Sequence, residues 1–197
     1  MRSLYVNTLA TGASLRAQEQ AYGKVRPSRD GTGEPPIGDE EWGFIAQRDS
    51  FYFGTITESG WPYIQHRGGP KGFVKVLGPT RIGWADVYGN RQLISAGAVA
   101  MNPRVSLFFM DYVARERLKL IGHARVSDSR EDFEGKDLLA TPGIKAERFF
   151  VVDIVGYDWN CPKYITPRYT AEQVEAVVGG LKDRILELEA KLAAAGS

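Results

Sequence analysis

Between residues 50 and 159, apolar and polar positions alternate in short runs, and glycine, proline and acidic residues separate these runs. A period of two is typical of strands with one buried face, and the separating residues are typical of turns. The pattern predicts six or seven strands, the first two joined by a tight turn at Glu58-Ser59-Gly60. Their ranges are 50–57, 61–69, 72–78, 80–87, 104–112, 117–128 and 146–159. Strands this short and numerous favour a small β-barrel carrying peripheral helices.

Helical patterns surround the strands. The predicted helices cover 13–23, 39–49, 90–103 and 129–140. The second begins with acidic residues, as helices often do, and should turn Trp42, Phe44 and Ile45 inward. Three parts follow from these patterns: an N-terminal helix and Pro/Gly-rich linker over 1–38, a mainly β domain over 39–169, and a C-terminal helix over 170–197.

The C-terminal helix has its own hydrophobic pattern. Apolar side chains follow one another at spacings of 4, 3, 4, 3 and 4 residues, at Val174, Val178, Leu181, Ile185, Leu188 and Leu192. This is the a/d seam of a heptad repeat, which packs against another helix. Two partners fit the pattern: the same helix of a second subunit, or the protein's own barrel.

Composition excludes several classes of protein. The 197 residues carry 25 Lys and Arg against 24 Asp and Glu, a net charge of +1, which argues against a general nucleic-acid binder. One cysteine and two histidines, Cys161, His66 and His123, exclude a disulfide framework and make a metal site unexpected. Since no apolar run approaches the ~20 residues that span a membrane and no hydrophobic signal core opens the chain, we expect a cytoplasmic protein without a membrane span.

The stretch "YIQHRGGPKGF", residues 63–73, places a histidine, an arginine and a lysine among three glycines and a proline. Glycine allows close approach of a ligand to the backbone, and the cations suit an anion. A hairpin corner with solvated charges explains the same residues.

A second stretch, "GWADVYGNRQLIS" at 83–95, ends a predicted strand and opens a predicted helix at Asn90-Arg91. A helix start offers free N–H groups and a positive dipole end, and Arg91 adds a charge with parallel donors. If the barrel brings Arg91 beside Arg67 and Lys71, these groups form a phosphate site. The alternative is a helix cap beside a surface arginine.

These stretches, together with "NPRVSLFFMDY" (102–112) and "RLKLIGHARV" (117–126), resemble the pyridoxamine 5′-phosphate oxidase-like family of flavin mononucleotide (FMN)-binding split barrels. "DWNCPKYITPR" (158–168) resembles the closing segment of one branch of that family. The resemblance covers roughly 40–170. It implies a split β-barrel, bound FMN, and a homodimer with the cofactor at the subunit interface.

Position by position, the resemblance implies a set of cofactor-binding residues. The strand end that touches flavin and phosphate corresponds to Gln65, His66, Arg67 and Gly68, with Lys71 behind it. The phosphate cradle corresponds to Gly89, Asn90 and Arg91, the aromatic cover of the ring to Trp84, and a flavin-contacting glutamine of the oxidase to Arg117.

The chain also departs from the family. One of the two cradle cations is absent, and Ala85 stands where a threonine hydroxyl would be. The oxidases end in an arginine-rich segment that binds the substrate's phosphate, whereas this chain continues into "NCPKYITPR" and the heptad helix. The resemblance therefore implies flavin binding without vitamin B6 oxidation.

The expected function is an FMN-dependent oxidoreductase that takes hydride or electrons from a reduced nicotinamide or a small substrate. The alternatives are a non-catalytic flavin-binding or electron-transfer module, and a relative that binds deazaflavin or haem. No catalytic residue follows from the sequence. His66 fits a ligand contact, a structural role or acid–base chemistry, and Cys161 fits a nucleophile or, before Pro162, a structural turn.

Overall fold

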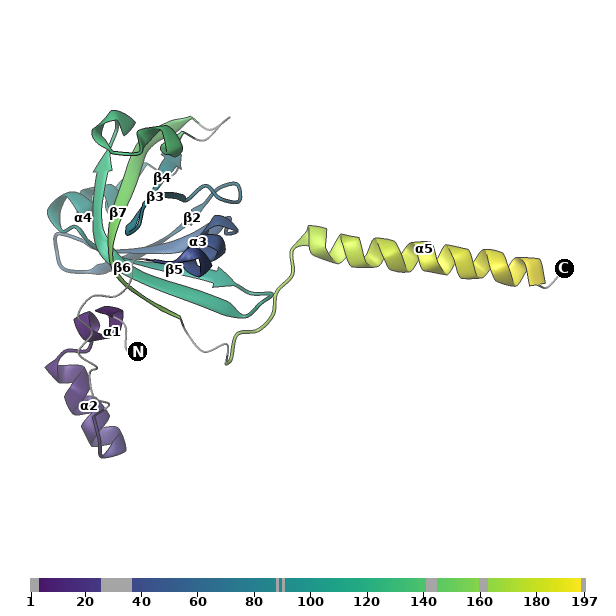
Figure 1. The fold of residues 1–197 in the computed structure, drawn as a ribbon, viewed down its shortest axis with the longest axis horizontal. Helices are drawn as coiled ribbons and strands as arrows, with labels where there is room; N and C mark the ends of the chain where they lie inside the picture. The colour runs from purple at the N-terminus through teal and green to yellow at the C-terminus, as the bar shows by residue number, and fades with distance from the viewer. Residues whose placement is uncertain are drawn as a thin grey trace.

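A computed structural model describes residues 4–25, 37–87, 89, 91–140, 145–159 and 163–195. Its strands form an antiparallel sheet in the order β2-β1-β5-β6-β7-β4-β3, which curls into a partly open barrel (Figure 1). The strands are β1 (Ser50–Ile56), β2 (Pro62–Gly68), β3 (Lys75–Gly78), β4 (Arg81–Val87), β5 (Arg104–Asp111), β6 (Glu116–Ser127) and β7 (Ala146–Trp159). The predicted mainly β barrel is confirmed.

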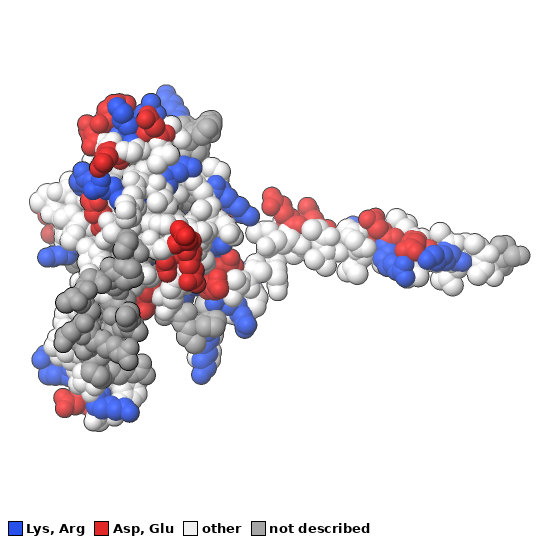
Figure 2. All heavy atoms as spheres, in the orientation of Figure 1, with Lys and Arg blue, Asp and Glu red and all other residues white. Residues whose placement is uncertain are grey.

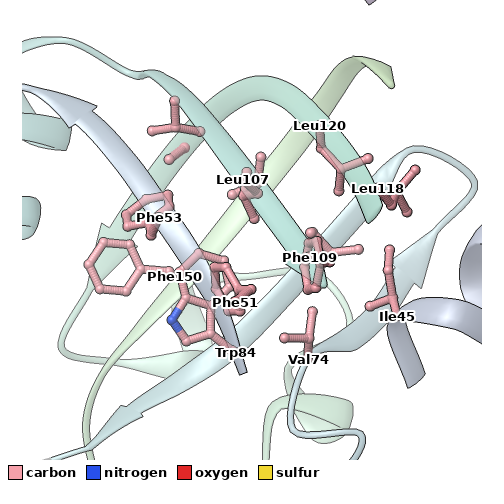
Figure 3. Packing of buried hydrophobic residues seen from close by; sticks show 14 of the residues in the cluster. Ile45, Phe51, Phe53, Val74, Trp84, Leu107, Phe109, Leu118, Leu120 and Phe150 are labelled. Carbon is pink, nitrogen blue, oxygen red and sulfur yellow. The ribbon is translucent and has the colours of Figure 1, made fainter. Parts of the chain in front are cut away.

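Alternation along the strands builds the core. In β1, Phe51, Phe53 and Thr55 are buried while the residues between them are not. Aromatic rings from several strands meet inside the barrel (Figure 3). Trp84 of β4 stacks on Phe150 of β7, with ring centroids 5.2 Å apart and planes 7° apart, and Phe51 and Phe53 approach its edge. Burial of such large rings supplies much of the driving force for folding.

The helices lie around the barrel. They are α1 (Leu4–Leu9), α2 (Gly12–Tyr22), α3 (Asp39–Ala46), α4 (Ile94–Met101) and α5 (Ala171–Ala195). As predicted, α3 buries Phe44 and Ile45 against the core. Its Glu41 is buried too, and its carboxylate accepts hydrogen bonds from the Gly38 amide (3.0 Å) and the Trp159 indole (2.8 Å), so the buried charge is satisfied.

Three helix predictions need correction. The sequence pattern gave no sign of α1. The helix expected over 129–140 is two 3₁₀ turns, Arg130–Asp132 and Lys136–Leu139, because Gly135 between them adopts a positive φ of 77°. The helix expected to open at Asn90-Arg91 starts at Ile94, since Arg91 and Leu93 have positive φ angles of 60° and 53°. Asn90 lies outside the described residues.

The C-terminal helix α5 extends away from the barrel (Figure 1). All its residues are described and none is buried, so it does not lie on its own barrel. The heptad seam is exposed along its length, and charges of both signs lie along the helix beside uncharged surface (Figure 2). Pairing of the seam with a second copy therefore stays a prediction. No helix within the described ranges is both long and apolar enough to cross a membrane.

The contact of α1 with the barrel depends on Gly156 in β7. A Cβ atom at this position would lie 2.5 Å from the Tyr5 backbone nitrogen, closer than any real contact. We expect Gly156→Ala to displace α1 and to speed tryptic cleavage at Arg16 and Lys24. Gly43→Ala in α3 is the control: it meets no atom within 4 Å and should stabilise the fold by about 0.5–1 kcal/mol. Equal cleavage of the parent and Gly156→Ala would contradict the assigned contact.

The exposed seam leads to a second prediction. A chain ending after Arg168 should keep the barrel's circular dichroism but self-associate more weakly than the full chain, as measured by light scattering at micromolar concentration. Leu188→Lys, in the seam, should weaken association, whereas Leu186→Lys, an exposed leucine outside the seam, should not. A monomeric full-length protein would refute the prediction.

Candidate functional site

One small pocket collects charged side chains at the open edge of the barrel. It forms where β2 and β4 end, β7 begins and α4 starts, and we call it the arginine pocket. Its polar lining consists of Gln65, Arg67, Asp86, Arg91, Ser95 and Arg148, with Glu147 beside them. Its volume is about 40 Å³. Since one ordered water needs about 10–15 Å³, the pocket suits a group the size of a phosphate.

Asp86 lies at the centre of this pocket. Its carboxylate accepts a hydrogen bond from Arg67 at 2.5 Å and a longer one from Arg148 at 3.3 Å. The three side chains are only 9–14% exposed, so water screens their charges weakly. Burial lowers the pKa of Arg67, and the neighbouring Asp86 opposes that shift by favouring the charged form. The guanidinium also lies 5.4 Å from the centre of the Phe150 ring, against the aromatic core.

A polar group from α4 completes the pocket. Ser95, in the first turn of α4, is 1% exposed, and its hydroxyl lies 3.5 Å from Oε1 of Gln65. The Tyr63 hydroxyl donates to the same oxygen at 3.1 Å and so orients the amide. The first amides of a helix have no partner within it and carry its positive dipole end. This end of α4 therefore adds donors and positive potential to the pocket.

The residues present fit an anionic group. Three arginines line the pocket against two carboxylates, Asp86 and Glu147. Nε of Arg67 is buried without a hydrogen-bond partner, which leaves a donor for an incoming acceptor. The pocket can thus hold a phosphate group but is too small for a flavin ring, which would have to lie outside it.

The fold brings some of the predicted site residues together. Gln65, Arg67 and Arg91 line the arginine pocket, as does Gly89. The sequence analysis missed Arg148, which lies directly across from Asp86 in the β4–β7 pairing. The sequence offered one sign of this role, because Arg148 is a charged residue on the inward side of the strand "AERFFVVD". Its partner Asp86 is identified only by the pairing of β7 with β4, which are far apart in the chain.

Other predicted residues lie elsewhere. Alternation along β2 turns His66 and Gly68 to the face opposite Gln65 and Arg67, and His66 packs edge-on against Tyr52. Lys71 and Arg117 line two further cavities. The Trp84 side chain is 1% exposed within the core and does not line the arginine pocket, and its expected role as a cover for the ring stays a prediction. Asn90 and Cys161 lie outside the described residues.

Comparison with solved structures finds the same fold elsewhere. A variant of HupZ from Group A Streptococcus matches 63% of this chain and 99% of its own with a TM-score of 0.52 at 11% identity, a likeness of fold alone. A Lactobacillus delbrueckii chain provisionally named as a pyridoxamine 5′-phosphate oxidase gives 0.49 at 16% identity, over 64% and 97% of the two chains. A Clostridium acetobutylicum protein related to general stress protein 26 gives 0.45 at 16%, over 61% and 85%. No curated protein sequence matches the chain.

Sequence models of protein families give a firmer result. The model described as pyridoxamine 5′-phosphate oxidase matches residues 37–156, more than half of the chain. The matched region contains β1–β6, most of β7, and the arginine pocket. The chain therefore belongs to the pyridoxamine 5′-phosphate oxidase family and has its split-barrel fold.

Proposed function

We propose that the protein binds FMN and acts as an FMN-dependent oxidoreductase. The observation that carries the proposal is the arginine pocket, where Arg67, Arg91 and Arg148 meet the start of α4. A phosphate monoester carries about −1.5 to −2 charges at neutral pH, and guanidinium groups bind its oxygens through parallel hydrogen bonds. The pocket's charge and size match that group.

Each residue of the pocket has a distinct task in this proposal. Arg91, on the loop before α4, adds a third guanidinium to the pocket beside Arg67 and Arg148. Ser95 and the first amides of α4 donate to phosphate oxygens. When bound, FMN would accept a hydride or electrons from a reduced nicotinamide or a small substrate, while the protein binds and orients it.

The reaction proposed is not that of the oxidase itself. The arginine-rich end that would hold a vitamin B6 phosphate is replaced by residues 158–168 and the helix α5. Family membership does not fix the substrate, because one fold hosts several reactions. The substrate can therefore be a small molecule other than a vitamin B6 phosphate.

We also propose a homodimer. The β1–β2 hairpin exposes large apolar side chains on the outer face of the barrel, Ile56, Trp61 and Ile64 at 39%, 71% and 68%. Ile56 and Ile64 border a cavity of about 370 Å³ that Val105 and Ile121 also line. Exposed apolar surface of this kind often marks a protein interface, and a second copy would cover it.

The chromophore of the purified protein tests the cofactor. We expect the absorbance of a flavin and release of FMN on denaturation, identified by mass, with little or no conversion of pyridoxamine phosphate to pyridoxal phosphate. The spectrum of a deazaflavin or a haem would show that the bound cofactor is that group and not FMN. Bound FMN without turnover of reduced nicotinamide would favour the electron-transfer module, and robust pyridoxal phosphate formation would refute the missing B6 activity.

Substitution of Arg91 tests the phosphate contact. A charge-assisted hydrogen bond contributes about 1.5–3 kcal/mol, so Arg91→Ala should weaken FMN binding on the order of ten- to a hundredfold in a fluorescence titration. Riboflavin, which lacks the phosphate, should bind parent and variant equally. Arg16→Ala, on the exposed surface of α2, is the matched control and should change neither ligand.

Arg67→Ala should weaken FMN binding as well, but it carries a structural cost. Removal of one partner from a buried ion pair typically destabilises a protein by about 3–5 kcal/mol, and Asp86 would keep only its contact with Arg148. The FMN affinity of Arg67→Ala must therefore be interpreted together with its thermal unfolding curve.

Equal FMN affinity in the parent and in Arg91→Ala would contradict the phosphate contact and leave Arg91 as an ordinary surface arginine.

A further inference from the structure

The helix α5 carries an apolar stripe that the rest of the described chain does not cover. Its seam, the apolar residues from Val174 to Leu192 that follow the heptad spacing, is 39–73% exposed, and the helix extends away from the barrel (Figure 1). Most helices in proteins are stabilised by packing of their apolar face, and an exposed apolar surface of this kind marks an interaction site. The side chains along α5 indicate which partner fits it.

The start of α5 is fixed by its own sequence. The Gln173 side chain accepts a hydrogen bond from the Thr170 amide at 2.9 Å, and the Thr170 hydroxyl accepts one from the Gln173 amide at 3.3 Å. This capping box satisfies two amides that a helix start otherwise leaves without partners. Gly179 and Gly180 do not interrupt the helix, and they follow Val178 at the outer heptad positions b and c, so the seam stays continuous.

The order of the spacings assigns each seam residue to a heptad position. A step of three residues leads from a to d, and a step of four leads from d to the next a. Position a therefore holds Val178, Ile185 and Leu192, and position d holds Val174, Leu181 and Leu188. The two central heptads thus place a β-branched residue at a and leucine at d, the combination that favours two parallel strands.

The charged residues that flank the seam indicate the orientation of the two helices. In a parallel pair, a residue at g faces the residue at e of the partner five positions later, and Arg184 and Glu189 occupy these positions. Arg184 forms an ion pair with Glu187 of its own helix, and its five N–H donors suffice for a second carboxylate. No ion pair within the described part of the chain involves Glu189, so its carboxylate can accept one from the partner.

The opposite orientation brings like charges together. Antiparallel pairing of the whole seam places residues at g beside g, and residues at e beside e. Arg184 would then face the partner's Arg184, and Lys182 the partner's Lys182. Glu189 would face the partner's Glu175. All of these contacts repel, whereas the contact of Arg184 with Glu189 in the parallel pair attracts, so the charges favour the parallel orientation.

We propose that α5 forms a parallel, in-register, two-stranded coiled coil with α5 of a second copy of this chain, and that Arg184 and Glu189 pair across it on both sides. The parallel orientation places both barrels at the same end of the coiled coil. Its two-fold axis can then coincide with that of the proposed homodimer, so that the same two chains form both contacts. The coiled coil does not depend on bound FMN.

Disulfide formation tests the orientation. Val178→Cys and Leu188→Cys are introduced together into the full-length protein, in which Cys161→Ser removes the native thiol. The helix separates the two positions by about 15 Å, and a disulfide requires Cα atoms within about 7 Å of each other. Parallel pairing therefore joins each position to its own counterpart, whereas antiparallel pairing of the whole seam joins position 178 to position 188 of the partner. Trypsin cleaves between the two positions, at Lys182 and Arg184, so the mass of the linked peptides distinguishes these results.

We expect links from position 178 to 178 and from position 188 to 188. Leu186→Cys, at an exposed leucine outside the seam, is the control and should stay unlinked under the same oxidation. Links between positions 178 and 188 of two chains, equal linking of the control, or no links at all would overturn the coiled coil. A dimer by light scattering without any link would leave the proposed homodimer of barrels in place, so the two proposals fail separately.

Charge reversal tests the ion pair. In a chain with Leu188→Cys as its single thiol, the fraction of linked protein at equilibrium in a glutathione buffer reports how well the helices pair. Arg184→Glu and Glu189→Arg, each alone, create repulsion on both sides and should lower the equilibrium constant for linking roughly three- to tenfold, and the double variant should restore it. Lys182→Glu, which reverses a charge facing the partner's Val177 in the parallel pair, is the control and should change nothing. Tighter pairing in Glu189→Arg, or no recovery in the double variant, would overturn the parallel orientation.

Discussion

The contact of Asp86 with Arg67 joins two strands of the sheet that hydrogen bonding leaves apart. In the strand order, β2 lies at one edge and β4 is next to the last strand at the other edge. The 2.5 Å ion pair between Arg67 of β2 and Asp86 of β4 bridges this gap beside the core. The open side of the barrel is thus closed by buried charges rather than by a strand ladder. The geometry of the arginine pocket, and the position of α4 above it, depend on that closure.

This closure also determines which charges and hydrogen-bond donors the arginine pocket offers to an anion. Arg67 and Arg148 already compensate Asp86, so they present fixed donors rather than two unopposed charges. In the proposed function, Arg91, Ser95 and the start of α4 supply the remaining attraction for a phosphate. Because the ion pairs are buried, the donors are held in place before a ligand arrives, and less entropy is lost when it binds.

The sequence predicted the strands well, because alternation is a local signal and is clear in β1, β2 and β5 of this barrel. The same signal indicates where the Trp84 side chain points: Ile82, Trp84 and Asp86 share one face of β4, and all three are buried. Lys71, three residues beyond the end of β2 at Gly68, lines a different cavity from Arg67.

Other features depend on contacts between residues far apart in the chain. Arg148 gains its role only through the pairing of β7 with β4, which no short motif encodes. The late start of α4 results from positive φ angles at Arg91 and Leu93, which residue type alone does not indicate. Likewise, the segment at 163–168 lines one cavity together with residues of β1 and β5, which lie from about fifty to more than a hundred positions earlier in the chain.

The short turn between β1 and β2 determines the pairing register of these two strands. Thr57 and Trp61 close it with a backbone hydrogen bond of 2.9 Å and a contact of 3.1 Å between the Thr57 hydroxyl and the Trp61 amide. The turn sets which residue of β2 stands opposite which residue of β1. A slip of one residue would turn every β2 side chain to the other face. Gln65 and Arg67 would then leave the arginine pocket, so a length change of a single residue here would dismantle that pocket while leaving the amino acids themselves intact.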